Sequence, residues 1–303
     1  MSSILPRIIT IVGTNASGKS SLGIELARAF GGEIISADSR QVYKGFDLCC
    51  GKVTAEEREM APHHLLDVRE IGEPFSVSNF QQMAYHAADD IIARGKTPLI
   101  VGGTGLYVNS VVYGYVMQDE EADIELRYKL EGFPIEKLQS MLTGEGRAFL
   151  ELNPSDWKNK RRIIRIIEKT TRGEPLEYTN SKRYEALQLG TLWSKEAIHS
   201  RIDERLETRL AQGMIDEVKT YLENGGNPKY LYDLGLEYRY ILRFLTGEFQ
   251  SMDEFKLELG RAIKRLAKKQ VTWFKRDNTI NWLDMTADYL QQAEALVADF
   301  LSK

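Results

Sequence analysis

The sequence has very few cysteines and no long apolar run, and each absence removes a class of protein. Its two cysteines are the adjacent Cys49 and Cys50. Neighbouring cysteines do not form an ordinary disulfide staple, and two thiols are too few for a four-cysteine zinc site. No apolar stretch approaches the about 20 residues that a membrane-spanning helix needs. The first residues also lack the basic and apolar segments of a signal peptide. We therefore expect a cytoplasmic protein with no membrane partner.

The sequence also lacks an overall excess of basic charge, because 44 acidic residues outnumber 40 basic ones. The basic residues are nevertheless concentrated in two segments. Segment 260–276 contains seven lysines and arginines and no acidic residue, and segment 158–172 contains seven with Glu168 as its one acid. A basic face on an acidic protein can bind a polyanion. Solvated helix faces would give the same pattern, so the charge distribution leaves both interpretations open.

Apolar segments alternate with helical periodicity along the first third of the chain. Strands are expected at about 7–12, 33–37 and 98–101, and helices over about 19–29 and 78–94. Such alternation predicts an α/β fold, a parallel sheet flanked by helices as in P-loop NTPases. Ligands of these sheets bind beyond the carboxyl ends of the strands.

The pattern changes after residue 114. Residues 115–190 consist of charged helical segments with glycine breaks, which indicates an inserted, mostly helical subdomain. The catalytic core would then comprise 1–114 and 191–303. In its second part, apolar residues recur every four positions from Ile198 to Leu222 and predict one long helix.

The stretch GTNASGKS follows the first strand and matches the phosphate-binding pattern G-x-x-x-x-G-K-[ST]. A strand before it and a helix after it are the context that gives this pattern meaning. Lys19 supplies a fixed positive charge, the helix dipole adds to it, and the Ser20 hydroxyl can ligate Mg²⁺. We predict a diphosphate site made of the whole loop: Gly13, Thr14, Asn15, Ala16, Ser17, Gly18, Lys19 and Ser20.

Other parts of a triphosphate-hydrolysing enzyme are hard to find. A magnesium-binding aspartate normally closes an apolar strand, but the strand at 98–101 ends in Gly102 and Gly103. The guanine-reading motif Asn-Lys-x-Asp does not occur. Triphosphate hydrolysis is therefore poorly supported.

Asp38 follows the second strand and is expected beside the phosphate loop. A carboxylate there can ligate Mg²⁺, act as a general base or cap a turn. Ser39, Arg40 and Gln41 follow on the same loop, and their hydrogen-bonding groups suit contacts to a base edge and to phosphate.

These segments resemble the bacterial tRNA dimethylallyltransferase family, in order and spacing, over about residues 8 to 284. The matching segments are GTNASGKS, IISADSRQVYKG, APHHLLDV, PFSVSNF, PLIVGGTGLY, KKQVTWFKR and INWLD. Members transfer a dimethylallyl group from dimethylallyl diphosphate to N6 of the adenine just 3′ of the anticodon, position 37, with Mg²⁺. The resemblance thus implies dimethylallyl diphosphate, Mg²⁺ and the anticodon arm of tRNA as ligands, and we expect a monomer.

The resemblance also implies a role for each site residue. Lys19, Ser20 with Mg²⁺ and the loop N–H groups would stabilise the leaving diphosphate. Asp38 would accept the N6 proton, and Thr104 would line the reaction channel. The target base would have to leave its stack to reach them. The residues expected to contact tRNA are Asp38, Ser39, Arg40, Gln41, Thr104, Arg127, Arg161, Arg162 and Arg165.

The sequence departs from the family pattern at several positions. Ile124 replaces a proline, Glu237 replaces a glycine, and Leu234 stands where some members carry a polar or basic residue. These changes bear on substrate discrimination more than on the chemistry.

Other functions remain open at this point. An adenylate isopentenyltransferase would use the same donor with free AMP as acceptor, and a P-loop small-molecule kinase would transfer phosphate from ATP. A non-catalytic RNA-binding module would not need Lys19 and Asp38 to converge.

Overall fold

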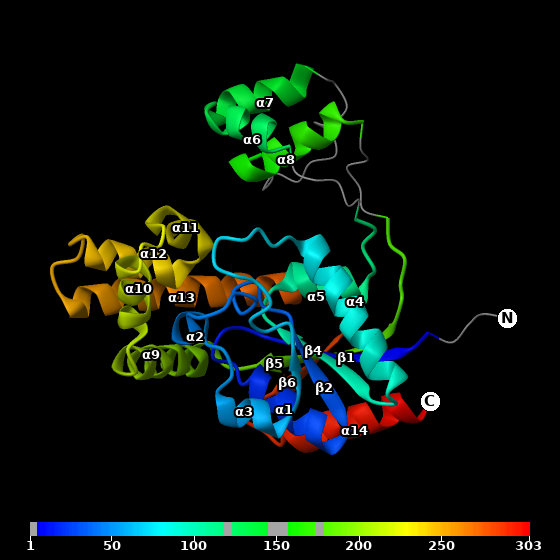
Figure 1. Ribbon diagram of the computed structural model, residues 1–303. Helices are drawn as coiled ribbons and strands as arrows, with labels where there is room; N and C mark the ends of the chain where they lie inside the picture. Colours follow the sequence, from blue (N-terminus) through cyan, green and yellow to red (C-terminus); the bar gives the residue numbers. More distant parts are fainter. Residues whose placement is uncertain (1–4, 118–122, 145–156, 174–178) are drawn as a thin grey trace. The chain divides into compact units, whose positions relative to one another are not determined.

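The computed structural model describes residues 5–117, 123–144, 157–173 and 179–303 (Figure 1). It divides the chain into two compact units. The first comprises Met1–Gly114 and Lys182–Lys303, and the second comprises Tyr115–Ser181. The predicted insert ran to residue 190, so the structure assigns nine more residues to the first unit than the sequence did.

A parallel sheet of six strands organises the described part of the first unit, in the order β3-β2-β4-β1-β5-β6. Each neighbouring pair is parallel, so the carboxyl ends of the strands share one edge. The strands are β1 (Arg7–Val12), β2 (Gly32–Ser36), β3 (His63–His64), β4 (Thr97–Gly102), β5 (Glu185–Leu192) and β6 (Ile280–Asp284).

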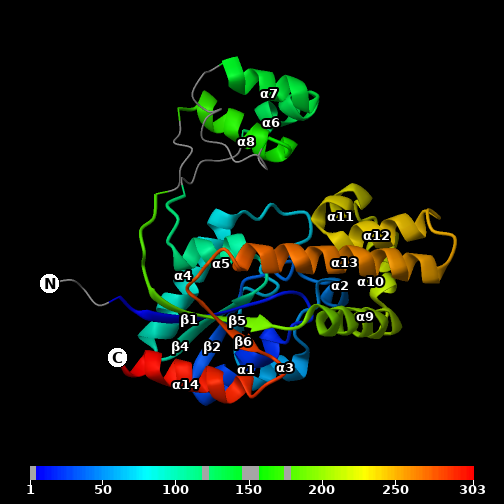
Figure 2. The ribbon, with the colours of Figure 1, turned by 180° about the vertical axis from the view of Figure 1, so that it is seen from behind.

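Helices cover both faces of this sheet (Figures 1 and 2). Ile8 and Val12 of β1 pack toward α4 (Val77–Ala93) and α5 (Gly105–Val112). Ile9 and Ile11 pack toward α1 (Lys19–Ala29) and α14 (Tyr289–Ser302). Because both faces of the strand are buried, residues 8–12 of β1 are apolar except for the buried Thr10. Two short helices, α2 (Asp47–Cys50) and α3 (Ala55–Met60), lie between β2 and β3 in the chain.

A group of helices packs together beside the sheet around a second apolar core. It contains Leu206, Met214, Tyr238 and Phe255 among its buried residues. Its helices are α9 (Lys195–Ala211), α10 (Met214–Glu223), α11 (Pro228–Leu234), α12 (Leu236–Leu245) and α13 (Met252–Phe274). Figure 2 shows α13 running along this group toward α5.

Two sequence predictions in this half of the chain were wrong. The expected single helix from 198 to 222 is two helices, because Gly213 between α9 and α10 has φ 100°, a left-handed conformation that favours glycine. Residues 185–190 belong to β5, which pairs with β1 and β6. The strand was missed because its sequence EALQLGTL places Gln188 and Thr191 at buried positions.

The second unit contains three described helices around its own small core. They are α6 (Ile124–Glu131), α7 (Ile135–Gly144) and α8 (Lys160–Thr171). Leu130, Leu138, Ile163 and Ile167 are buried between them. Across both units, none of the helices within the described residues combines the length and apolarity that a membrane crossing requires.

Candidate active site

The edge of the sheet where β1, β2 and β4 end carries the residues that the sequence singled out. The phosphate loop follows β1, Asp38 follows β2, and Thr104 follows β4. The Thr104 N–H donates to the Ala37 carbonyl at 3.2 Å, which joins the ends of β2 and β4. The structure therefore brings the predicted loop, Asp38 and Thr104 together.

The phosphate loop is fixed from outside by side chains that follow β5. Trp193 Nε1 donates to the Ser17 carbonyl at 2.9 Å, and Arg201 Nε donates to the Ala16 carbonyl at 2.8 Å. The Arg201 guanidinium also lies 4.5 Å from the centre of the Trp193 ring. Gly13 admits no side chain, because a Cβ there would lie 2.1 Å from Thr191 Oγ1. The Asn15 and Ser17 N–H groups bind within the protein, to Gln270 Oε1 and to the Thr14 carbonyl. An anion would therefore be held by the N–H groups at the start of α1, which have no partner within the helix.

Cations gather around a cleft of about 360 Å³ beside the loop, which Lys19, Ser20, Arg201 and Arg205 help to line. Burial and the nearby Arg205 charge lower the pKa of Lys19 to about 8, although the Asp38 carboxylate opposes this effect. Burial, together with Arg209, lowers the pKa of Arg205 to about 10. Positive charges that depress one another's pKa values favour binding of an anion. The cleft is thus suited to a phosphate group.

The side chain of Asp38 is held by its own loop. Its Oδ1 accepts a hydrogen bond from the Arg40 backbone N–H at 2.9 Å. Beside it, Thr104 Oγ1 accepts from the Ser39 N–H at 3.1 Å. Because the Thr104 oxygen accepts this bond, its hydroxyl hydrogen can still be donated to a ligand.

Gln41, another predicted tRNA contact, is engaged at both ends of its side chain. The Ser36 hydroxyl donates to its Oε1 at 2.9 Å, and its Nε2 donates to the Gly51 carbonyl at 3.1 Å. In this arrangement Gln41 shapes the loop that carries Asp38.

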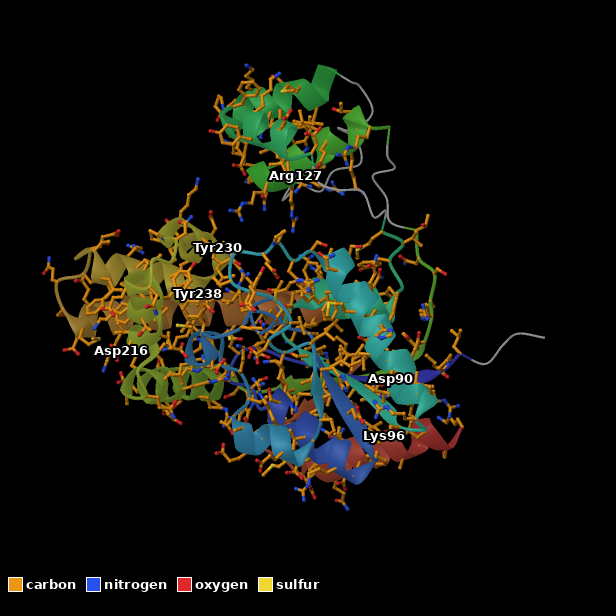
Figure 3. All side chains as sticks on the ribbon, in the orientation of Figure 1. Asp90, Lys96, Arg127, Asp216, Tyr230 and Tyr238 are labelled. Atoms are coloured by element: carbon orange, nitrogen blue, oxygen red, sulfur yellow. The ribbon has the colours of Figure 1, made fainter. Side chains whose placement is uncertain are left out.

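Two of the predicted tRNA-contacting arginines of the second unit bind a buried carboxylate. Arg127 of α6 (Figure 3) and Arg165 of α8 donate to Glu168 Oε2 at 2.7 and 2.8 Å. Burial raises the pKa of Glu168, but these hydrogen bonds outweigh it and lower the pKa to about 2. Arg161 and Arg162 are exposed on α8.

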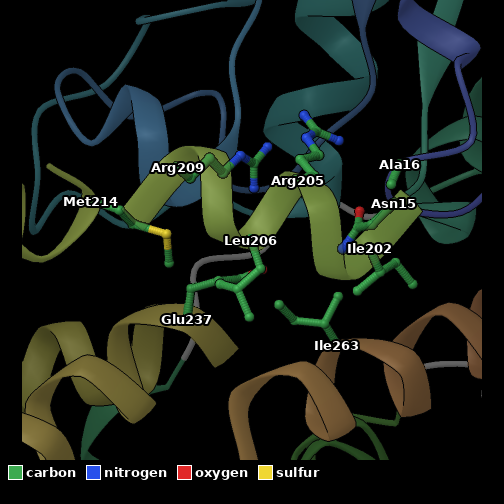
Figure 4. A pocket seen from close by; sticks show the side chains of 9 residues that line it. All are labelled: Asn15, Ala16, Ile202, Arg205, Leu206, Arg209, Met214, Glu237 and Ile263. Atoms are coloured by element: carbon green, nitrogen blue, oxygen red, sulfur yellow. The ribbon is translucent and has the colours of Figure 1, made fainter. Parts of the chain in front are cut away.

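A small pocket lies behind the phosphate loop, between it and the helices α9, α12 and α13 (Figure 4). Its volume of about 20 Å³ is enough for about one water-sized group. The lining residues are Asn15, Ala16, Ile202, Arg205, Leu206, Arg209, Met214, Glu237 and Ile263. Glu237, which departs from the family pattern, therefore lies next to the site, and burial raises the pKa of its carboxyl group.

The sequence reasoning missed several residues of this site, namely Thr191, Trp193, Arg201, Arg205, Arg209 and Gln270. One signal was available for three of them. Arg201, Arg205 and Arg209 recur every four residues, so they form a basic stripe on α9 beside its apolar face. The other three make contacts between segments far apart in the chain, which no local pattern reveals.

The sequence matches one known family over most of its length. Residues 41–277 match the family described as IPP transferase. The tRNA dimethylallyltransferase 2 of Shewanella sediminis is 40% identical over 300 residues, which cover 96% of this chain and 98% of that protein. The tRNA dimethylallyltransferase 1 of Geotalea daltonii is 40% identical over 299 residues, covering 97% of this chain and 96% of its own.

Solved structures of similar proteins share the fold. The tRNA isopentenylpyrophosphate transferase of Bacillus halodurans superposes with a TM-score of 0.74 at 32% identity, covering 98% of this chain and 97% of that one. A eukaryotic dimethylallyltransferase, solved in snapshots of its action on tRNA, superposes with a TM-score of 0.82 at 25% identity, covering 98% and 80%. The predicted α/β fold class is confirmed by these likenesses and by the sheet itself.

Proposed function

The chain belongs to the IPP transferase family, and we propose that it transfers a dimethylallyl group from dimethylallyl diphosphate to N6 of the adenine at tRNA position 37. One observation carries this assignment beyond family membership. Lys19 follows β1 and Asp38 follows β2, so both lie at the same edge of the sheet, where the hydrogen bond from the Thr104 N–H to the Ala37 carbonyl joins the ends of β2 and β4. The leaving group would bind at the phosphate loop, and Asp38 would act as the base from the same edge of the sheet.

The leaving group is the part of the reaction that the loop serves. N6 attacks carbon 1 of the donor, the bond between carbon 1 and the phosphate oxygen breaks, and diphosphate departs with the electron pair. Lys19, Arg201, Arg205 and the N–H groups at the start of α1 would stabilise the charge that develops on the diphosphate. Preorganised cations and N–H groups of this kind are usually the largest contribution to catalysis.

Ser20 fits a Mg²⁺ ion that would bind together with the diphosphate. It is the second residue of α1 and lines the polar cleft. No cluster of three or more His, Cys, Asp or Glu side chains suited to a metal is found in the described residues. Mg²⁺ commonly takes few protein ligands and completes its shell with substrate phosphates and water. When bound there, the ion would neutralise charge on the leaving diphosphate.

The acceptor side needs a group that removes a proton from N6. Asp38 would take that proton, since the Arg40 N–H fixes its carboxylate and Thr104 lies beside it. Thr104 would donate its hydroxyl hydrogen to a donor phosphate or to the adenine. A positioned general base contributes about 10²–10⁴-fold to such a rate.

An acceptor assay tests this function. The protein is incubated with labelled dimethylallyl diphosphate, Mg²⁺ and either unmodified tRNA or AMP, and the label in each acceptor is measured. We expect labelled tRNA and no labelled AMP. Label in AMP alone would contradict the proposal and favour an adenylate isopentenyltransferase.

A further inference from the structure

Gln270 connects two parts of the candidate site that come from distant segments of the chain. It lies on α13, within the basic segment 260–276. Its Oε1 accepts a hydrogen bond from the Asn15 backbone N–H at 3.1 Å. Its Nε2 donates to the Gly103 carbonyl at 3.0 Å. One side-chain amide therefore joins the phosphate loop to the end of β4.

Gly103 is connected to the acceptor side of the site, which contains Thr104 and Asp38. Thr104 is the next residue, and its Oγ1 accepts a hydrogen bond from the Ser39 N–H at 3.1 Å. Ser39 in turn follows Asp38 directly. Gln270 is thus linked through three short steps to the candidate base, while its other end holds the loop that would bind the diphosphate.

Close packing restricts the position of this amide. A Cβ on Gly103 would lie 2.6 Å from Gln270 Nε2, and a Cβ on Gly105 would lie 2.2 Å from the Trp273 ring. Gln270 and Trp273 are three residues apart on α13, so they project from the same side of the helix. Phe274 is 2% exposed and anchors the end of α13 in the sheet core. The helix therefore contacts both glycines that flank Thr104.

We propose that Gln270 is a positioning residue for the transfer reaction, which fixes the distance between the phosphate loop and the wall formed by Thr104 and Asp38. This role rests on the proposed function. The leaving diphosphate would bind to the phosphate loop. The adenine N6 would approach the wall that contains its proton acceptor, Asp38. A displacement of about 1 Å between reacting groups can cost about 100-fold in rate. Gln270 acts through the Asn15 N–H and the Gly103 carbonyl.

A pair of matched variants tests this role. Gln270→Met keeps the length of the side chain and removes both hydrogen bonds. Gln188→Met is the control, because Gln188 of β5 is buried and donates two hydrogen bonds, to Asp277 Oδ2 at 3.0 Å and Thr279 Oγ1 at 2.6 Å, away from the loop. We expect Gln270→Met to lower kcat about 10- to 100-fold while the Kd for tRNA changes less than about 2-fold. Gln188→Met should lower the Tm and leave kcat within about 2-fold.

Combination with Thr104→Ala separates positioning from a general structural role. If Gln270 acts through Thr104, the kcat losses of Gln270→Met and Thr104→Ala will be less than multiplicative, whereas those of Gln188→Met and Thr104→Ala will multiply. An active unaltered protein whose Gln270→Met variant keeps its kcat would contradict this role alone. An unaltered protein that labels no tRNA would contradict the proposed function and this role with it.

Discussion

At the scale of single residues, Asp38 and Lys19 have separable tasks, and a change at each should affect a different measurement. Asp38→Asn keeps an oxygen that can accept the Arg40 N–H bond and removes the basic carboxylate. We expect its kcat to fall at least about 100-fold while tRNA binding is retained. Asp90→Asn is the control, because that carboxylate is exposed and pairs with Arg94 on α4. An Asp38→Asn enzyme with the unaltered kcat would contradict the assignment of the base.

The pH dependence of kcat/KM for the donor should follow the ionisation of Lys19. Burial and Arg205 lower its pKa to about 8, so the ammonium is charged below that pH and neutral above it. Because the charged form binds diphosphate, kcat/KM for the donor should fall above about pH 8, approaching a tenfold loss per pH unit. Lys19→Arg keeps its charge, so its profile should stay flat up to about pH 10 even if its absolute rate is lower. A flat profile of the unaltered protein from pH 7 to 9.5 would contradict this prediction.

At the scale of helices and strands, the carboxylate of Glu168 on α8 forms an ion pair with Arg127 of α6. Its side chain is fully buried and binds Arg127 and Arg165, which are about one third exposed. Removal of one partner from a buried ion pair costs about 3–5 kcal/mol. We expect Glu168→Gln to destabilise the second unit by an amount at the lower end of this range, because both arginines are partly exposed to water. Faster amide hydrogen exchange confined to α6 and α8 would support this, and unchanged exchange there would contradict it.

The Glu168 carboxylate also predicts how the stability of the second unit changes at low pH. The pKa of Glu168 falls to about 2 in the folded chain, below its ordinary value of 4.5. Its ionised form is therefore favoured by folding, so the stabilisation is complete above pH 4.5 and declines as the pH falls toward 2. The protection factors of amides in α6 and α8, which are exchange rates corrected for their intrinsic pH dependence, should fall over this interval in the unaltered protein, with a smaller change in Glu168→Gln.

Local sequence patterns predicted the strands whose apolar residues are buried on both faces of the sheet. Strands β1, β2 and β4 each contain consecutive buried apolar residues, because helices cover both of their faces. The ends of these strands placed the loop, Asp38 and Thr104 on one edge. The pattern failed where polar side chains are buried for specific contacts. Gln188 and Thr191 of β5 are examples, since Thr191 donates to Ser17 Oγ at 2.7 Å.

The side chains that bind the phosphate loop could not be predicted from local patterns for a different reason. The basic stripe on α9 was visible in the sequence, but its contact was not, because Arg201 binds Ala16 across 185 residues of sequence. Gln270 likewise binds Asn15 across 255 residues. Such pairs depend on how α9 and α13 pack against the sheet edge, which sequence periodicity does not specify.

At the scale of the whole molecule, each unit carries one of the two basic segments, and the structure distinguishes residues within them. In the second unit, Arg127 and Arg165 bind the buried Glu168, and Arg161 and Arg162 lie at more exposed positions of α8. In the first unit, Lys268, Lys269, Lys275 and Arg276 are exposed along the end of α13 and the turn after it. Exposed cations at these positions suit the phosphates of a tRNA, as expected for an acceptor of this family.

This distinction predicts how tRNA affinity responds to salt. Each phosphate contact to RNA contributes about 0.7–0.9 to the slope of log Kd against log salt concentration. Joint replacement of Arg161 and Arg162 by alanine should therefore weaken binding at low salt and reduce the slope by about 1.5. Arg127→Ala should act mainly on the stability of the second unit, because its guanidinium is held by Glu168. Lys303→Ala is the control, since that lysine pairs with Asp299 at the end of α14. A slope that falls as much in Arg127→Ala as in the double variant would show that the Glu168 pairing does not withhold Arg127 from the RNA.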